Sequence, residues 1–199
     1  MIDSPDGSKA SAMDKRIFAI VSELNGDAHA TIQALWHELE EACGLKAIKM
    51  FPLVHFSWQG AGFYDIEPLE EALDHLSRVT SPLLVRAGGL GIFTGDLPVI
   101  YIPLVKDTAL ARFHQEMWAQ TQAFAHHNNP YYAPDLWVPH ISLALQDVTR
   151  ENIGCAIERL AFRSLELTLQ INNLALVYQF GDHIGQLYRS FELRGETIQ

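Results

Sequence analysis

Two pairs of residues in this sequence have types and a spacing suited to acid–base chemistry. The first pair is His55 and Ser57, and the second, in the other half of the chain, is His140 and Ser142. Successive side chains of a β-strand point to opposite faces, so each histidine would share a face with its serine. Apolar residues occupy the opposite face of both segments. The pattern therefore predicts two strands that pack on a core and present a histidine and a serine to a cleft.

Imidazole suits proton transfer at neutral pH because its ordinary pKa is about 6.5. Across one cleft, a neutral histidine can take a proton from an attacking water or hydroxyl, while a protonated histidine gives one to the leaving oxygen. Each such group contributes roughly 10²–10⁴ in rate. Serine hydroxyls beside the histidines can donate to the non-bridging oxygens of a phosphate and stabilise developing charge. These residue types predict phosphodiester chemistry that needs no metal and no organic cofactor.

Two other interpretations of the histidines stay open. A histidine in a half-buried strand can be a hydrogen-bonded structural residue, and each motif taken alone fits that description. The two histidines can also be metal ligands. Zinc sites usually take three or four protein ligands, and no His-x-His or His-x-x-x-His spacing adjoins either motif. We therefore expect no metal at this site.

The paired motifs resemble those of the 2H phosphoesterase superfamily, which includes bacterial 2′-5′ RNA ligase-like proteins and cyclic nucleotide phosphodiesterases. The second segment, WVPHISL at 137–143, is similar to the Pro-His-x-Ser/Thr strand of that superfamily. The first segment, PLVH at 52–55, departs from it because no proline directly precedes the histidine. The resemblance covers about residues 16–193.

The resemblance implies a metal-independent phosphoesterase that acts at ribose 2′ phosphodiesters. The reaction would be hydrolysis of a 2′,3′-cyclic phosphate or reversible 2′-5′ RNA ligation. His55 and His140 would be the catalytic acid and base, in an order that their near-symmetry leaves open, and Ser57 and Ser142 would bind the phosphate. Two alternatives stay open: a superfamily member acting on another small diester, such as ADP-ribose cyclic phosphate or 2′-5′ oligoadenylate, and a non-catalytic module that binds nucleotides or RNA ends.

The elements that must position the motifs follow the same plan in both halves of the chain. Each half has a strand, a helix, the motif strand and a second helix: 16–24, 28–43, 52–58 and 66–80 in the first half, and 99–104, 107–125, 137–145 and about 149–162 in the second. Two long strands end each half, within 83–104 and within 165–193. In the first half, we expect the strands at 83–93 and 98–104 to form a hairpin. We predict an α+β fold of two interlocked, pseudo-symmetric lobes, with antiparallel sheets facing a central cleft and helices on the outer faces.

Several local signals refine this plan. Asp27 is a candidate cap for the first helix, and Gly44 is a candidate residue to end it. Trp36 falls on the apolar stripe of that helix, which predicts a place in the core. Segment 88–91 contains three glycines and no phosphate-loop pattern, so we expect a bulge or a sharp bend there.

Composition limits the range of partners. The first 14 residues are small and polar, which predicts a disordered leader before a single bilobal domain over 15–195. A net charge of −10 argues against broad binding to long duplex nucleic acid, which needs many lysines and arginines. The charge favours a short substrate over a duplex, and the resemblance implies that this partner is a small nucleotide or an RNA end with a cyclic phosphate or a 2′-5′ linkage, which we expect a monomer to bind.

The chain also lacks sequence signals for export or membrane insertion. No apolar run reaches the ~18–20 residues of a membrane span, and the N-terminus lacks the basic-then-apolar order of a signal peptide. Cys43 and Cys155 both fall inside expected helices and suggest no disulfide framework. We therefore predict a reduced, cytoplasmic protein that does not bind membranes.

Two segments near the motifs, 59–65 and 126–136, are candidate substrate-contacting loops. Tyr131, Tyr132 and Trp137 can stack on a base, which is worth ~1–3 kcal/mol per base in single-strand binders, or they can pack the loop. Both interpretations stay open. A bound phosphate needs a cation nearby, and the candidates from the sequence are Lys49, Arg86, Lys106 and Arg189.

Overall fold

Antiparallel strands and helices make up the fold. The computed structural model describes residues 16–180 and 183–195, so the leader predicted at 1–14 lies outside the described residues. The strands are β1 (Arg16–Glu23), β2 (His55–Gly60), β3 (Phe63–Tyr64), β4 (Leu83–Ala87), β5 (Gly91–Phe93), β6 (Val99–Pro103), β7 (Ala125–His126), β8 (His140–Ala144), β9 (Leu167–Ile171), β10 (Asn173–Phe180) and β11 (His183–Glu192). The helices are α1 (Gly26–Cys43), α2 (Ile66–Val79), α3 (Thr108–Thr121) and α4 (Ile153–Ala161).

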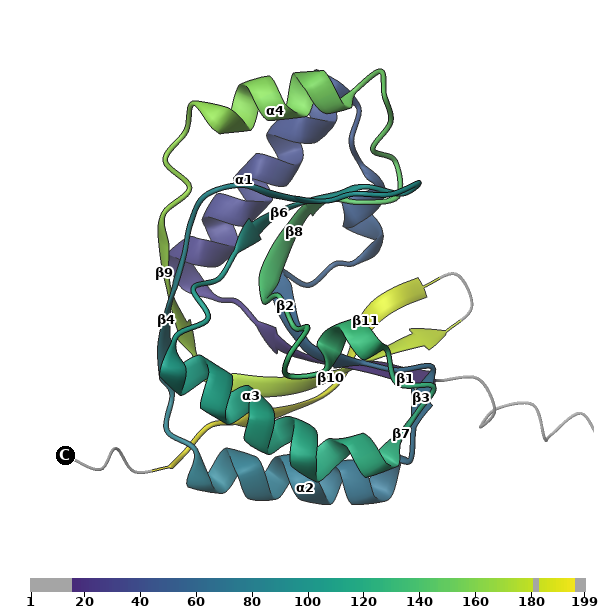
Figure 1. The fold of residues 1–199 in the computed structure, drawn as a ribbon, viewed down its shortest axis with the longest axis vertical. Coiled ribbons are helices and arrows are strands. Elements are labelled where there is room, and N and C mark those ends of the chain that lie inside the picture. The colour runs from purple at the N-terminus through teal and green to yellow at the C-terminus, as the bar shows by residue number, and fades with distance from the viewer. Residues whose placement is uncertain (1–15, 181–182, 196–199) are drawn as a thin grey trace, which may run out of the picture.

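The two motif strands belong to different sheets. A four-stranded sheet has the order β11–β10–β1–β2, and a three-stranded sheet has the order β5–β6–β8. Two further ribbons pair β3 with β7 and β4 with β9. Helices α1 and α4 lie at the end of the molecule that holds β6 and β8, and α2 and α3 lie beneath the four-stranded sheet (Figure 1). This arrangement confirms the predicted α+β class with antiparallel sheets, whereas the pseudo-symmetry of two lobes stays a prediction.

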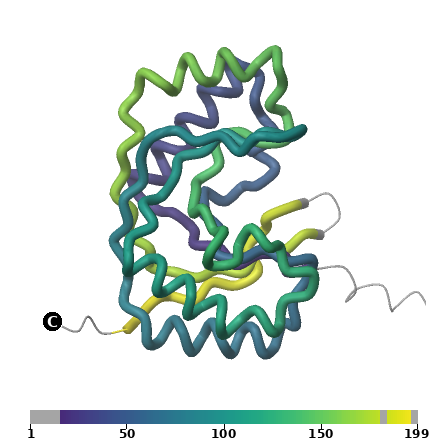
Figure 2. Tube along the Cα trace, viewed as in Figure 1, coloured from purple at the N-terminus to yellow at the C-terminus, as the bar shows by residue number. Residues whose placement is uncertain are grey.

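The two halves of the chain exchange elements. Strands β10 and β11 come from the second half, yet they extend the sheet of β1 and the first motif strand, β2 (Figure 2). The Ser22 hydroxyl of β1 donates to Asn173 O of β10 at 2.5 Å, and the Trp58 indole of β2 donates to Ser22 Oγ at 2.7 Å. Conversely, α1 from the first half packs against β8 of the second. The sheet that carries the first motif therefore needs strands from both ends of the sequence.

The strand predicted over 83–93 divides where the glycines lie. β4 pairs with β9, whereas β5 pairs with β6, so only the second piece forms the expected hairpin. Gly89 lies between them with φ +81°, a left-handed conformation that favours glycine. The predicted bend is thus confirmed, and it moves the chain from one sheet to another. The segment predicted as two strands over 165–193 likewise contains a third strand, β9.

The ends of α1 agree with the sequence signals only in part. Asn25 rather than Asp27 occupies the N-cap position, and its side chain makes no capping hydrogen bond. Asp27 lies in the first turn, where a negative charge is favourable near the helix N-terminus. Gly44 ends the helix as predicted, with φ 71° and its N–H donating to Glu40 O.

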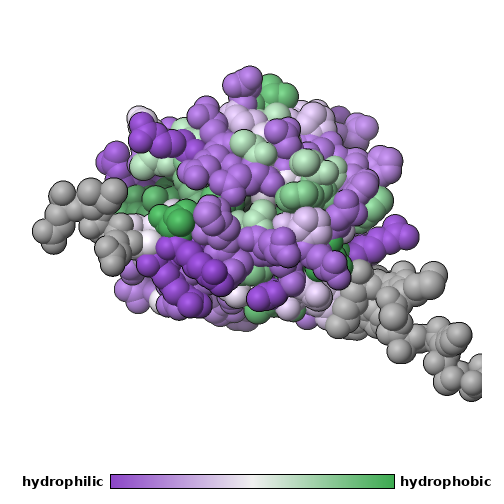
Figure 3. Space-filling view, turned by 90° about the horizontal axis from the view of Figure 1, so that it is seen from below, coloured by the Kyte–Doolittle hydropathy of each residue, from purple (hydrophilic) through white to green (hydrophobic). Residues whose placement is uncertain are grey.

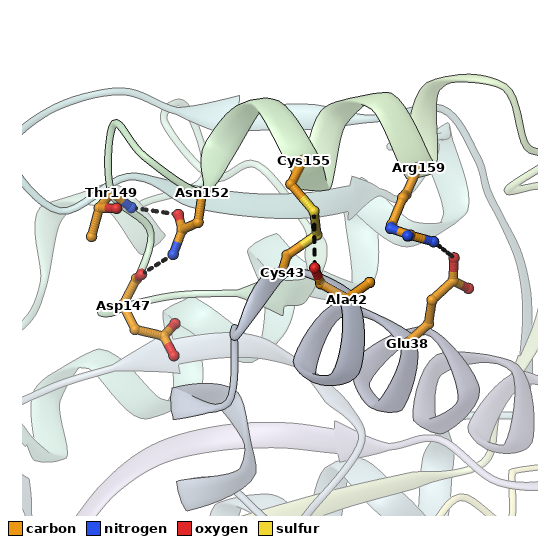
Figure 4. Close-up of a disulfide and its surroundings, with 8 residues drawn as sticks. All are labelled: Glu38, Ala42, Cys43, Asp147, Thr149, Asn152, Cys155 and Arg159. Carbon is orange, nitrogen blue, oxygen red and sulfur yellow. Dashed lines mark hydrogen bonds and ion pairs between the residues drawn. A yellow bond between two sulfur atoms is a disulfide. The ribbon is translucent and has the colours of Figure 1, made fainter.

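A disulfide joins Cys43 at the end of α1 to Cys155 in α4, so the prediction of no disulfide is wrong (Figure 4). The Cα atoms are 5.8 Å apart, within the usual range for disulfides. Ion pairs support the same helix contact, because Glu38 of α1 lies 3.6 Å from Arg159 and 2.7 Å from Arg163. The sequence places the cysteines in separate helices but does not show that these helices meet.

The cysteines consequently no longer argue for a reducing compartment, and the cytoplasmic location stays a prediction. Among the described helices, none has the length and apolar character needed to cross a membrane. The face seen from below, which is the α2 and α3 end of Figure 1, is mostly hydrophilic with scattered apolar side chains (Figure 3).

The disulfide predicts a measurable stabilisation. It links residues 112 positions apart, and removing a crosslink that closes so long a loop costs ~2–5 kcal/mol. We expect the Cys43→Ser/Cys155→Ser double variant to unfold in urea with a free energy lower by about that amount than the oxidised protein. Reduced wild type is the control and should match the double variant. Equal stability of oxidised and reduced wild type would contradict the prediction.

Candidate functional site

The two motif strands have the alternation that their sequences predict. In β2 and just before it, Val54, Phe56 and Trp58 are buried, whereas His55 and Ser57 are only half-buried. In β8, Ile141 and Leu143 are fully buried, whereas His140 and Ser142 are only half-buried. Each strand is thus anchored by its apolar face and presents its two polar side chains on the other.

The structure brings all four motif residues to one cavity of about 450 Å³, a size typical of small-molecule sites. His55, Ser57, His140 and Ser142 line it together. Its remaining walls are mainly apolar, with two further polar side chains, and include Phe18, Ile48, Phe51, Leu145 and Val177 together with Asn129 and Tyr132. The cavity can therefore offer polar groups to one end of a ligand and apolar surface to the rest.

Both histidines are held in the same way. His55 Nδ1 lies 2.7 Å from Leu53 O, and His140 Nδ1 lies 2.8 Å from Val138 O. A carbonyl oxygen only accepts hydrogen bonds, so each Nδ1 carries a hydrogen and donates it to the carbonyl two residues earlier. In the neutral ring this leaves Nε2 as the basic nitrogen, the atom available for proton transfer.

Burial lowers the pKa of both histidines below the ordinary value. For His55, desolvation is the main cause and the nearby His140 lowers the pKa further, while the Leu53 carbonyl opposes the shift. For His140, desolvation lowers the pKa and the Val138 carbonyl opposes it. The mutual effect means that protonation of one ring disfavours protonation of the other. The pair therefore favours states in which at most one of the two rings is protonated.

A β-bulge follows the motif serine in each strand. The register between β1 and β2 shifts by one residue after Ser57, which leaves Trp58 as the extra residue. The register between β6 and β8 shifts in the same way after Ser142, which leaves Leu143 as the extra residue. Bulges disrupt the ladder locally and re-aim side chains, and they are frequent next to active sites. The two motifs thus share a backbone irregularity at the same position.

An indole donates to each motif serine's carbonyl at this irregularity. Trp137 Nε1 donates to Ser57 O at 3.0 Å, and Trp36 Nε1 donates to Ser142 O at 3.0 Å. Each tryptophan comes from outside the strand it contacts. These two residues were missed as site residues, because the sequence predicts only core packing for Trp36 and leaves base stacking or packing open for Trp137. The structure shows that Trp137 is buried and packs.

A buried aromatic stack holds the Trp137 indole in place. The ring lies 3.8 Å from the His114 ring and 5.4 Å from that of Trp58, both nearly parallel to it. The His114 ring donates through Nε2 to Trp58 O, and burial lowers its pKa to about 4, so it is neutral at physiological pH. Lys106 Nζ donates to Trp137 O at 3.2 Å. This stack packs against the buried side of the first motif strand and holds Trp137, which precedes the second.

The cations suggested by the sequence do not line the cavity. Lys106 is engaged by backbone carbonyls, and Lys49 pairs with Glu40 on the surface. Arg189 pairs with Glu70 at 2.7 Å, and Arg86 lines a separate hollow with residues 88 and 89. None of the four candidates therefore lines the cavity, and a cation beside a bound phosphate stays a prediction. Within residues 16–180 and 183–195, no group of three or more His, Cys, Asp or Glu side chains is placed to hold a metal ion.

The two candidate loops come together beside the cavity. β3 and β7 form a short ribbon between them, and Asn129 N donates to Gly60 O at 2.9 Å. Tyr132 lines the cavity, whereas Tyr131 has 74% of its surface exposed and is not among the cavity-lining residues. Outside the cavity, His126 Nε2 lies 3.0 Å from both Asp65 carboxylate oxygens. Both loops therefore contribute to the cavity wall, the first through Gly60 and Ala61 and the second through Asn129 and Tyr132.

Comparisons with known proteins identify a matching family and similar folds. The family model for the 2′-5′ RNA ligase superfamily matches residues 26–183. A search of curated proteins finds no significant match. The fold is similar to that of TT0787 of Thermus thermophilus, with a TM-score of 0.61 and 18% identity over 92% of this chain and 100% of that one.

The fold is also similar to that of E. coli LigT. The structure of LigT complexed with 3′-AMP gives a TM-score of 0.54 at 13% identity, over 90% of this chain and 98% of LigT. The structure of LigT complexed with NADP+ gives the same TM-score at 12% identity. At such identities these likenesses concern the fold, and they agree with the predicted fold class.

The two indole contacts predict a matched pair of stability effects. Trp137→Phe keeps an aromatic ring but leaves Ser57 O without the indole donor, and Trp36→Phe does the same to Ser142 O. Losing the partner of a buried polar group costs ~1–3 kcal/mol. We expect each variant to lower the free energy of urea unfolding by that amount. Trp118→Phe, which changes a half-buried tryptophan away from both carbonyls, is the control. If the three variants had equal free energies of unfolding, the predicted contribution of the two indole hydrogen bonds would be contradicted.

Proposed function

Because the chain belongs to the 2′-5′ RNA ligase superfamily, we propose that it is a metal-independent phosphoesterase that acts at ribose 2′ phosphodiesters. This membership confirms the resemblance drawn from the paired motifs. The proposed reaction is hydrolysis of a 2′,3′-cyclic phosphate or reversible 2′-5′ RNA ligation. The observation that carries the proposal is the matched setting of His55 and His140, each bonded through Nδ1 to the carbonyl two residues earlier and both lining one cavity.

In the proposed hydrolysis, the neutral histidine takes a proton from water through its free Nε2 as the water oxygen bonds to phosphorus. The bond from phosphorus to one ribose oxygen breaks, and the protonated histidine gives its proton to that oxygen. Ser57 and Ser142 donate to the non-bridging oxygens, where negative charge builds up. The base histidine gains one proton and the acid histidine loses one. The pair therefore keeps the same number of protons, and the two rings exchange their protonation states.

In the proposed ligation, a 5′-hydroxyl replaces water as the nucleophile. The base histidine takes its proton, the bond to the ribose 3′ oxygen breaks, and the acid histidine protonates that oxygen. The phosphate then joins the 2′ oxygen to the new 5′ oxygen. The reverse path uses the same two groups with their roles exchanged, which suits a site where the two histidines are held alike.

The remaining walls of the cavity suit a small nucleotide. Apolar side chains such as Phe51 and Val177 offer surface for a base, away from the polar motif residues. LigT, which shares the fold, has been crystallised with 3′-AMP and with NADP+, and these ligands support a nucleotide in the present cavity. All four motif residues come from a single chain, so we propose that the active unit is a monomer.

The first test is a turnover assay on adenosine 2′,3′-cyclic phosphate and on a short RNA with a cyclic end, both in EDTA. We expect His55→Ala and His140→Ala each to lower kcat/KM by ~10² or more, because each removes one proton-transfer group. His75→Ala, an exposed histidine of α2, is the control and should retain full activity.

The outcomes of this assay separate the alternatives. Retained activity in either motif variant means that these strands are not the active site. Loss of wild-type activity in EDTA points to a metal hydrolase. A wild type that binds the nucleotide without turnover points to a binding module or to another diester as substrate.

The lowered histidine pKa values predict an acidic pH optimum. Catalysis needs one protonated and one neutral histidine, and that state is most populated between the two pKa values of the free enzyme. Since burial lowers the pKa of both His55 and His140 below about 6.5, the profile of kcat/KM should peak below pH ~6.5. Above the peak it should fall about tenfold per pH unit, as the singly protonated state is lost. An optimum above pH ~7.5 at constant ionic strength would contradict this mechanism.

A further inference from the structure

One wall of the cavity is built by the segment between α1 and β2, residues 44–54, which we call the wall segment. Two of its side chains, Ile48 and Phe51, line the cavity. The end next to β2 is fixed by the sheet, because Leu24 N donates to Val54 O at 2.8 Å. The positions of Ile48 and Phe51 therefore depend on what holds the end next to α1.

A carboxylate from the other half of the chain holds that end. Asp147 lies in the loop after β8, and its Oδ2 accepts hydrogen bonds from Lys46 N at 2.7 Å and from Ala47 N at 2.8 Å. Hydrogen bonds to a carboxylate are roughly twice as strong as neutral ones. Asp147 N in turn donates at 2.9 Å to the carbonyl of Leu145, which lines the cavity. Asp147 thus joins the loop after the second motif to the segment before the first.

The disulfide is a second connection between the same two parts of the chain. Cys43 directly precedes the wall segment, and Cys155 belongs to α4, which follows the loop of Asp147 (Figure 4). Asn152, the N-cap residue of α4, donates through Nδ2 to Asp147 O at 2.8 Å, so the carboxylate and the disulfide are attached to one unit. Neither cysteine is fully buried. A dithiol that reduces the bond leaves a thiol on each cysteine and is itself oxidised to a disulfide.

We propose that Asp147 is a positioning residue that keeps Ile48 and Phe51 at the cavity wall, and that the disulfide shares this role. Either connection holds the wall segment while the other is broken. When both are lost, the segment moves away from the loop after β8, and the cavity loses part of the surface that binds its ligand. The inference rests on the proposed function, which supplies the ligand and the substrate for its test.

The test compares Asp147→Ala in the oxidised protein with the same change in the Cys43→Ser/Cys155→Ser background. In the oxidised protein the disulfide still holds the segment, so we expect KM for adenosine 2′,3′-cyclic phosphate to rise about threefold at most. Without the disulfide, KM should rise about tenfold or more, the size of losing hydrogen bonds to a charged group. In both backgrounds kcat should change less than about twofold, since the β2 end of the segment, and with it His55, stays fixed.

Two further variants control for this substitution. Asp147→Asn keeps an oxygen that can accept from both N–H groups, so without the disulfide it should hold KM within about threefold of the protein with Asp147. Glu40→Gln removes the ion pair between α1 and Lys49 of the same wall segment. Because that pair is exposed and lies within the first half of the chain, its loss should leave KM unchanged in both backgrounds.

Two kinetic outcomes overturn the proposal. If Asp147→Ala raises KM by the same factor with and without the disulfide, or in neither case, the two connections do not share a role. If it lowers kcat at unchanged KM, Asp147 acts on the chemistry and not on the wall that binds the ligand.

Hydrogen exchange tests the position of the wall segment even if the variant with neither connection is too unstable to assay. Asp147→Ala would be prepared oxidised and then reduced with a dithiol, beside reduced wild type. Amides of residues 44–54 should exchange about tenfold faster in the reduced variant, while those of β2 exchange at the same rate. Faster exchange throughout, β2 included, would overturn the proposal, because the two connections would then stabilise the whole fold.

Exchange needs no turnover, so it separates this inference from the proposed reaction. Calorimetry would add the Kd of adenosine 2′-monophosphate for the same proteins. If wild type is inert on cyclic phosphates, but exchange and Kd both respond to Asp147→Ala only without the disulfide, the positioning role stands and the proposed reaction is wrong. If wild type turns over and exchange in the wall segment does not respond, the reaction stands and the positioning role is overturned.

Discussion

Trp137 holds the two motif strands together across the boundary between their sheets. It lies on the approach to β8, three residues before His140, yet its indole donates to Ser57 O in β2. The ring is held by stacking on His114 and Trp58, so the position of the N–H follows from packing beneath the cavity. Acid–base chemistry by two separate strands requires their side chains to hold position within about 0.5 Å. In this molecule the two strands are joined by an aromatic stack that does not itself line the cavity, and the proposed chemistry would depend on it.

The extra residue in β2 accounts for several features of the site at once. In a regular strand, Gln59 would follow His55 and Ser57 on the cavity face. The bulge at Trp58 turns Gln59 into the interior, where it is fully buried, and brings Gly60 to the cavity instead. The glycine leaves room for the Tyr132 ring, and the buried amide anchors the loop that carries it. A single irregularity thus creates both the space and the support for a neighbouring side chain.

The alternation within each motif predicted both strands and their inward and outward faces. The repeated plan of the two halves predicted that the four polar residues converge on one cleft. What the sequence did not show depends on contacts between distant elements. An apolar stripe predicts that Trp36 is buried, but the direction of its N–H depends on how α1 lies on β8. Cys43 and Cys155 are 112 positions apart in the sequence and meet only because α1 and α4 pack together. The sequence could not choose among the candidate cations for the same reason, because the direction of a lysine or arginine side chain depends on its acidic or carbonyl partner, such as Glu70 for Arg189.

The exchange of strands between the halves has a consequence for the growing polypeptide. β1 finds β2 soon after both are made, but its other edge pairs with β10, and the hydrogen-bonded residues Ser22 and Asn173 are 151 positions apart. At ~5–20 residues per second, the time between their syntheses is roughly 8–30 s. During that interval β1 presents an open, apolar edge to any other strand nearby. A chaperone that covers the nascent β1 would therefore act in the period before its last partners emerge.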